Sequence, residues 1–138
     1  MTQTLIDGLC FGEGPRWHKG KLWFSDMHAN TVYTVDMAGD LQTIVTLDND
    51  QPSGLGWLPD GRLLIVSMTQ RKLLVFSDGE LGEFADLSGL ATFHCNDMVT
   101  DSQGRSYVGN FGFDLHSGSE SAKRSEEHTS ELQSHLNL

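Results

Sequence analysis

Two short segments combine oxygen-bearing side chains with neighbours that let a ligand come close. Glu13 stands between two glycines at the start of a strand-like run, and small neighbours leave space for backbone or ligand. Asn96 opens a second such run and is followed by Asp97. Calcium takes carboxylate and amide oxygens, so Glu13 and Asn96 are candidate metal ligands, although a full shell needs about 6–8 oxygens. The competing explanations are a solvated turn glutamate and a turn-forming Asn-Asp pair.

His94 and Cys95 directly precede Asn96 and are the other reactive side chains of this segment. As ligands of a soft metal they would need His or Cys partners at short spacing, and the sequence has none. Adjacent residues on a strand point to opposite faces, which argues against a Cys-His nucleophilic pair. The sequence also lacks a Gly-rich phosphate loop leading into a helix and a Gly-x-Ser-x-Gly nucleophile elbow. No nucleophilic catalytic group is predicted.

The composition excludes several classes of partner. The chain has 138 residues, 38% of them hydrophobic, and a net charge of −10 from 19 acidic and 9 basic residues. Nucleic acids and anionic membranes need Lys and Arg, so we expect neither as a partner. No apolar run approaches the roughly 18 residues of a membrane span, and the first residues lack the basic charge of a secretory signal. The distant Cys10 and Cys95 are expected to be free thiols, and the predicted location is cytoplasmic.

Short β-type runs separated by turn residues must position these side chains. Fifteen glycines stand against three prolines, and no stretch keeps an apolar period near 3.6. Ser77–Glu80 contains Asp-Gly, a signal for a hairpin turn. The sequence therefore predicts strands rather than helices, and the clearest are Lys21–Ser25, Thr31–Asp36, Gln42–Leu47, Lys72–Phe76 and Gly82–Ala85.

An internal repeat groups these strands. A strand, a tight turn ending in glycine, a basic residue and another strand recur at Gly20, Gly61 and Gly104. The spacing of about forty residues is typical of four-stranded propeller blades. We predict an all-β fold, a partial β-propeller of about two and a half blades. Its inner strands would line a central channel, and its inter-blade core would contain Trp17, Trp23, Phe24 and Trp57.

The carboxyl-terminal end differs in composition from the repeats. After Leu115 the sequence becomes rich in Ser and Glu and loses the strand pattern. We predict a partial propeller over residues 1–117 and a non-native or disordered tail over residues 118–138. The stretch Arg124–His135 matches, in order, the translation of a common sequencing-library adapter, so we interpret Arg124–Leu138 as an assembly artefact. An ordinary disordered tail is the alternative.

Four segments carry a resemblance to a known family: FGEGPRW, LWFSDMH, QPSGLGWLPDGRLLIVSM and HCNDMVTDSQGRSYVGNFGFD. With these segments the chain resembles the senescence-marker-protein (regucalcin), gluconolactonase and luciferin-regenerating-enzyme family. The resemblance implies part of a six-bladed propeller with one divalent cation, usually calcium, in the central channel. It also implies hydrolysis of sugar lactones such as gluconolactone, or of organophosphates in related members.

The resemblance also implies roles for individual residues. Glu13 matches the metal-ligand glutamate of the first blade, and Asn96 matches an asparagine that lines the metal and substrate pocket. His94 stands where animal members place a substrate-binding arginine, so sugar specificity does not carry over with it. A later asparagine and the general-base aspartate of the family have no match here. The implied function is the amino-terminal fragment of a calcium-dependent sugar-lactone hydrolase, inactive on its own, with a small-molecule lactone as substrate of the full-length parent.

Two other functions remain open at this point. One is a non-enzymatic propeller segment that serves as a binding or scaffold module. The source sequence beyond Leu115 would discriminate, since channel-facing Asn and Asp residues in later blades favour the enzyme. The other is a half-propeller that pairs with a second copy to close the ring. A defined dimer in sedimentation would support that arrangement.

Overall fold

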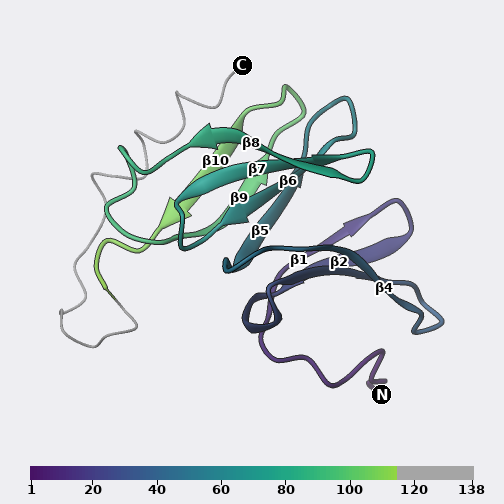
Figure 1. The fold of residues 1–138 in the computed structure, drawn as a ribbon. Helices are drawn as coiled ribbons and strands as arrows, with labels where there is room; N and C mark the ends of the chain where they lie inside the picture. The colour runs from purple at the N-terminus through teal and green to yellow at the C-terminus, as the bar shows by residue number, and fades with distance from the viewer. Residues whose placement is uncertain (115–138) are drawn as a thin grey trace.

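The fold consists of antiparallel sheets in chain order (Figure 1). The computed structural model describes residues 1–114. A four-stranded sheet contains β1 (Gly12–His18), β2 (Lys21–Asp26), β3 (Thr31–Val35) and β4 (Leu41–Thr46), with a 3₁₀ turn at Met27–Ala29. A second contains β5 (Pro52–Trp57), β6 (Leu63–Ser67), β7 (Lys72–Ser77) and β8 (Glu80–Asp86). The last pairs β9 (Cys95–Thr100) with β10 (Ser106–Asn110).

This arrangement confirms the all-β partial propeller. The two four-stranded sheets are complete blades, here called blade 1 and blade 2, and β9 with β10 forms the opening pair of blade 3. Every predicted strand is present, with ends that shift by one or two residues. The proposed division at residue 117 and the adapter-like stretch lie outside the described residues. Within residues 1–114, no helix is long and apolar enough to cross a membrane.

Tight turns set the register of the hairpins. Gly20, Gly61 and Gly104 have φ values of 78°, 93° and 83°, which an L-residue with a side chain adopts only with strain. Asp78 and Gly79 also have positive φ, 51° and 78°, as the Asp-Gly hairpin signal predicts. The glycines of the repeat are therefore needed for backbone conformation.

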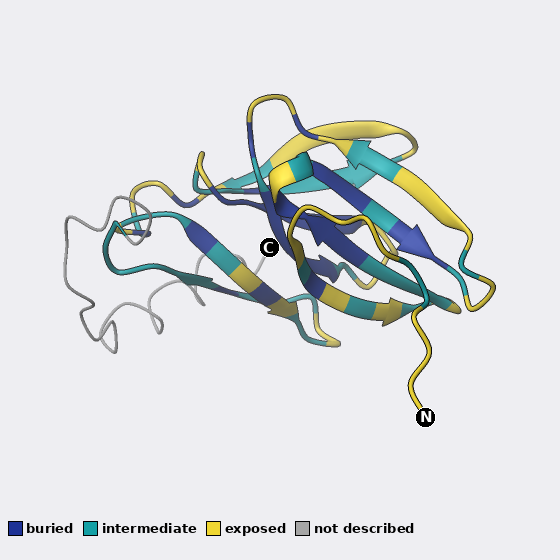
Figure 2. Cartoon of the chain, turned by 90° about the horizontal axis from the view of Figure 1, so that it is seen from below, coloured by how far each residue is buried: buried dark blue, intermediate teal, exposed yellow. Residues whose placement is uncertain are grey.

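Blade 2 is packed on both faces, against blade 1 on one side and blade 3 on the other. The buried residues are dark blue in Figure 2. All five residues of β6 are buried, and the four apolar ones, Leu63–Val66, alternate between two apolar clusters. Leu63 and Ile65 pack toward blade 1 with Trp23 and Trp57, while the opposite face packs toward blade 3. A strand covered on both faces reads as a continuous apolar run, which Leu63–Val66 is. The cluster on the opposite face consists of Leu64, Val66, Leu73, Leu87, Ala91, Cys95, Met98 and Val108.

One of the predicted core residues is on the surface. Phe24 is buried, and Trp23 and Trp57 pack in the cluster between blades 1 and 2, as predicted. Trp17 is 60% exposed, so its assignment to the core is wrong. Trp17 pairs with Leu22 and Trp23 with Arg16, which places the two tryptophans on opposite faces of blade 1. The equivalent tryptophan of blade 2, Trp57, is covered by blade 1, whereas no described blade covers Trp17.

Candidate metal and substrate site

The inner strands β1, β5 and β9 lie side by side and bring three polar residues to the same end of the blades. Glu13, Ser53 and Asn96 each stand four positions before a residue at the equivalent place near the strand end, namely Trp17, Trp57 and Thr100. Because the blades repeat the same geometry, equivalent positions lie at the same level along neighbouring inner strands. Ser53 was missed by sequence reasoning, although superposing the repeats at these three end residues would have found it.

Glycines allow the inner strands to approach each other. A Cβ at Gly14, which also has a φ of 57°, would lie 2.8 Å from the Ser53 carbonyl oxygen. A Cβ at Gly54 would overlap the backbone nitrogen of Met98, and one at Gly56 would lie 2.6 Å from Thr100 Oγ1. These distances are too short for any side chain, so the glycines permit the close packing of β1 on β5 and of β5 on β9.

Side-chain hydrogen bonds link β2, β5 and β9 at this level. Ser25, which pairs with Glu13 in the β1–β2 register, donates its hydroxyl to the Ser53 carbonyl oxygen at 2.6 Å. The Ser53 hydroxyl donates in turn to Asn96 Oδ1 at 3.0 Å. Ser25 and Ser53 are fully buried, and buried hydroxyls keep their hydrogen-bond partners. This chain of contacts fixes the orientation of the Asn96 amide.

Arg16 joins blade 1 to blade 3 across the inner strand of blade 2. Its Nη2 donates to Asp97 Oδ1 at 2.8 Å and to the Met98 carbonyl oxygen at 2.6 Å. Asp97 Oδ1 also accepts the Met98 backbone N–H at 2.8 Å. The Asp97 carboxylate is therefore engaged with the backbone of its own strand and with Arg16, and it orients the segment that carries Asn96.

Glu13 is half-buried and lies where β1 bulges between Glu13 and Arg16. The chain before it is fixed by the buried Asp26 carboxylate, which accepts the backbone N–H groups of Cys10 at 2.9 Å and Phe11 at 2.7 Å. Hydrogen bonds of this kind to a carboxylate are among the stronger ones in proteins. Glu13 also borders an apolar hollow of about 210 Å³ beside Phe24. The backbone that leads into Glu13 is thus held in place by Asp26.

His94 and Cys95 lie in different surroundings. The His94 ring stacks on Phe93 with ring centroids 4.0 Å apart. Cys95 is fully buried in the cluster between blades 2 and 3, and loss of solvation raises the pKa of its thiol to about 11. A neutral, buried thiol is a poor nucleophile. Cys95 is therefore a core residue.

The oxygen ligands at this end are of the type that a hard cation binds, but they are fewer than such a cation needs. Glu13 offers a carboxylate, and Asn96 offers one amide oxygen that already accepts a hydrogen bond from Ser53. Residues 1–114 contain no cluster of three or more His, Cys, Asp or Glu side chains that could hold a metal ion. Calcium takes about 6–8 oxygens, so these donors are part of a shell. The assignments of Glu13, His94 and Asn96 remain predictions.

Successive four-stranded sheets, with polar residues gathered at one end of their inner strands, define a protein of the β-propeller class. The sequence matches the SMP-30/Gluconolactonase/LRE-like region family over residues 11–135, and the chain belongs to that family. A search of curated proteins found no match.

Solved structures share the fold. A gluconolactonase from Xanthomonas campestris matches with a TM-score of 0.71 at 19% identity, over 88% of this chain and 43% of that one. The calcium-binding protein regucalcin from Agrobacterium tumefaciens matches with a TM-score of 0.61 at 22% identity, over 75% and 36%. Virginiamycin B lyase from Staphylococcus aureus matches with a TM-score of 0.61 at 14% identity, over 72% and 34%. The chain thus spans less than half the length of each of these proteins.

Proposed function

We propose that the chain is the amino-terminal part of a calcium-dependent sugar-lactone hydrolase of the gluconolactonase type. Family membership supports the reaction class, and the calcium-binding regucalcin among the structural relatives supports the cation. The observation that supports the proposal is that Glu13, Ser53 and Asn96 stand near the starts of adjacent inner strands, where the Ser53 hydroxyl bonds the Asn96 amide. The substrate is a small-molecule lactone, bound where the central channel opens.

In this proposal each residue has a separate role. Glu13 and Asn96 bind the cation through oxygen, and Ser53 holds the Asn96 amide in a fixed orientation through the hydrogen bond at 3.0 Å. Asn96 and His94 contact the lactone, because an amide and an imidazole can each donate and accept hydrogen bonds to a sugar. A bound divalent cation supplies Lewis-acid polarisation of the lactone carbonyl. No residue of the described part is assigned as the general base.

The proposal gives this chain a weak cation site and no turnover. Glu13 and Asn96 provide one carboxylate and one amide oxygen, and water completes the shell. An incomplete shell lowers affinity because ligand charge and number set the strength of calcium binding. Hydrolysis needs a group that activates water, which the proposed residue set lacks.

Calorimetric titration of the chain with calcium, with a parallel gluconolactone assay, tests this proposal. We expect weak binding, a dissociation constant of about 1 mM or higher. Glu13→Gln should abolish the heat, and there should be no lactone hydrolysis above the uncatalysed rate. Glu80→Gln removes the same charge from an exposed strand end and serves as the control. The site is contradicted if Glu80→Gln abolishes the binding heat, or if Glu13→Gln leaves it intact. Lactone hydrolysis by the chain would contradict the predicted inactivity.

A further inference from the structure

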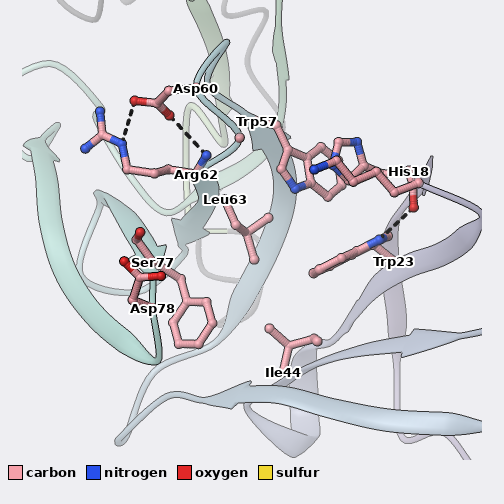
Figure 3. A pocket seen from close by; sticks show the side chains of 12 residues that line it. His18, Trp23, Ile44, Trp57, Asp60, Arg62, Leu63, Ser77 and Asp78 are labelled. Carbon is pink, nitrogen blue, oxygen red and sulfur yellow. Dashed lines mark hydrogen bonds and ion pairs between the residues drawn. The ribbon is translucent and has the colours of Figure 1, made fainter.

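A cleft lies between blades 1 and 2, at the end of the inner strands opposite to Glu13 and Asn96 (Figure 3). Its volume is about 380 Å³, within the range of about 300–1,000 Å³ that small-molecule sites occupy. His18 and Trp57, which line it, end β1 and β5, whereas Glu13 and Asn96 stand near the starts of their strands. All its lining residues fall between positions 18 and 78, so two complete blades form it without any further part of a ring.

Aromatic side chains fixed by their own contacts form the floor. The Trp57 ring stacks on His18 with centroids 3.9 Å apart and an angle of 12°. Trp23 meets Trp57 edge to face at 5.4 Å, and its Nε1 donates to the His18 carbonyl oxygen at 3.0 Å. Phe76 and the buried Leu63 complete the apolar surface. Because the rings are held by each other, the floor exists before any ligand arrives.

The rim carries both signs of charge in equal number. Asp60 and Arg62 neutralise each other through an ion pair of 2.9 Å on blade 2. Lys19 on blade 1 and Asp78 on blade 2 have no hydrogen bond or ion pair to another residue within positions 1–114. Burial and the neighbouring Lys19 lower the pKa of His18, so its ring adds no charge at neutral pH. The rim thus favours neither anions nor cations but offers a donor, an acceptor and the Ser77 hydroxyl.

From this combination we propose that the cleft binds a neutral sugar ring. The C–H face of a pyranose packs against aromatic faces, whose π-electrons carry partial negative charge. Its hydroxyls donate and accept hydrogen bonds, so one ring can use both the Lys19 ammonium and the Asp78 carboxylate. A charged ligand would leave one of these two groups without a complementary partner. The site is separate from the channel and needs no metal ion.

Saturation-transfer NMR with methyl β-glucopyranoside tests this site, since the glycoside is neutral and has no lactone bond. We expect transfer to the sugar ring protons, shifts of the Trp23 and Trp57 indole N–H signals, and a dissociation constant of about 1–10 mM. Chelation of metal ions and Glu13→Gln should leave all of these unchanged. That independence separates the result from the proposed lactonase site.

Two variants and a matched control make the assignment specific. Asp78→Asn keeps a residue that tolerates positive φ, and it should weaken binding about fivefold by removing a charged acceptor. Phe76→Leu should weaken it by a similar factor through loss of an aromatic face. Asp40→Asn, in the corresponding turn of blade 1 but outside the cleft, should change nothing. If Phe76→Leu fails to fold, Asp78→Asn alone decides.

Several results would overturn the proposal. One is absence of saturation transfer to the glycoside. Another is binding that Asp78→Asn leaves intact. A third is tighter binding of gluconate or glucosamine than of the neutral glycoside, because the balanced rim should discriminate against both. Indole shifts that disappear on chelation would place the sugar at the channel instead.

Discussion

At the scale of single residues, the two cysteines differ in burial. Cys10 is exposed, whereas Cys95 is fully buried between blades 2 and 3, where the loss of solvation raises its thiol pKa to about 11. Thiolates, not thiols, react with alkylating agents, so the two residues should differ in reactivity as well as in access.

We therefore predict that iodoacetamide at pH 8 modifies Cys10 and leaves Cys95 unmodified until the chain is unfolded. Peptide mass spectrometry before and after denaturation measures this. Rapid native-state modification of Cys95 would show that the packing between blades 2 and 3 is absent in solution.

The same shift predicts how stability depends on pH. Burial holds the folded-state pKa of Cys95 above 9.0, the ordinary value for a cysteine thiol, so the folded state keeps this proton at a pH where the unfolded state loses it. Stability from this group is complete below pH 9 and falls as the pH rises through about 11, by about 1.4 kcal/mol per unit of pKa difference. Denaturant titrations at several pH values measure this as the decrease in unfolding free energy between pH 9 and 11. Cys95→Ala should make that decrease smaller, and an unchanged decrease would refute the prediction.

Residue types in the sequence pointed to Glu13 and Asn96 as candidate site residues but not to Ser53. Glu13 and Asn96 stand out in the sequence because a glycine-flanked carboxylate and an Asn-Asp pair are unusual at strand starts. Ser53 follows a proline and precedes Gly54, a pattern typical of a turn. Its hydrogen bond to Asn96 crosses from blade 2 to blade 3, and such long-range contacts leave no local signal.

At the scale of elements, close approach of the inner strands depends on a backbone without side chains. Gly54 has no room for a Cβ beside the Met98 backbone, and backbone atoms cannot give way as a flexible side chain can. Overpacking a well-packed interior costs about 1–3 kcal/mol, and more where backbone must move.

Gly54→Ala should therefore lower the free energy of unfolding by about 3 kcal/mol or more, as measured by urea denaturation. The control is Gly89→Ala, where an added Cβ meets no atom within 4 Å, and it should stay within about 1 kcal/mol of the parent. Equal stabilities for the two variants would mean that β5 and β9 are not adjacent.

The strands and hairpins were predictable because their signals are local. Alternating side chains and glycine turns define each strand within a few residues, and the Asp78–Gly79 turn is an example. The exposure of Trp17 was not predictable this way. Trp17 and Trp57 have equivalent positions in their blades, but burial depends on which element packs against the face, and only Trp57 has a described neighbour there.

At the scale of the whole molecule, the repeat period predicted the number and order of blades. Blade 2 is packed between blades 1 and 3, and the inner strands converge so that Glu13, Ser53 and Asn96 share one end while the aromatic cleft occupies the other. The cleft could not be predicted, because it arises from the packing of His18 of blade 1 on Trp57 of blade 2. The two proposed sites therefore lie at opposite ends of the inner strands.

The most direct test of the convergence at the channel end is paramagnetic broadening of backbone amide NMR signals by substoichiometric Mn²⁺, an ion that oxygen ligands also bind. The account predicts that the signals of Glu13, Ser53 and Asn96 broaden together, before those of His18 and Trp57, and that Glu13→Gln removes the effect. Broadening of Glu13 without Asn96, or broadening centred on another acidic part of the chain, would contradict it.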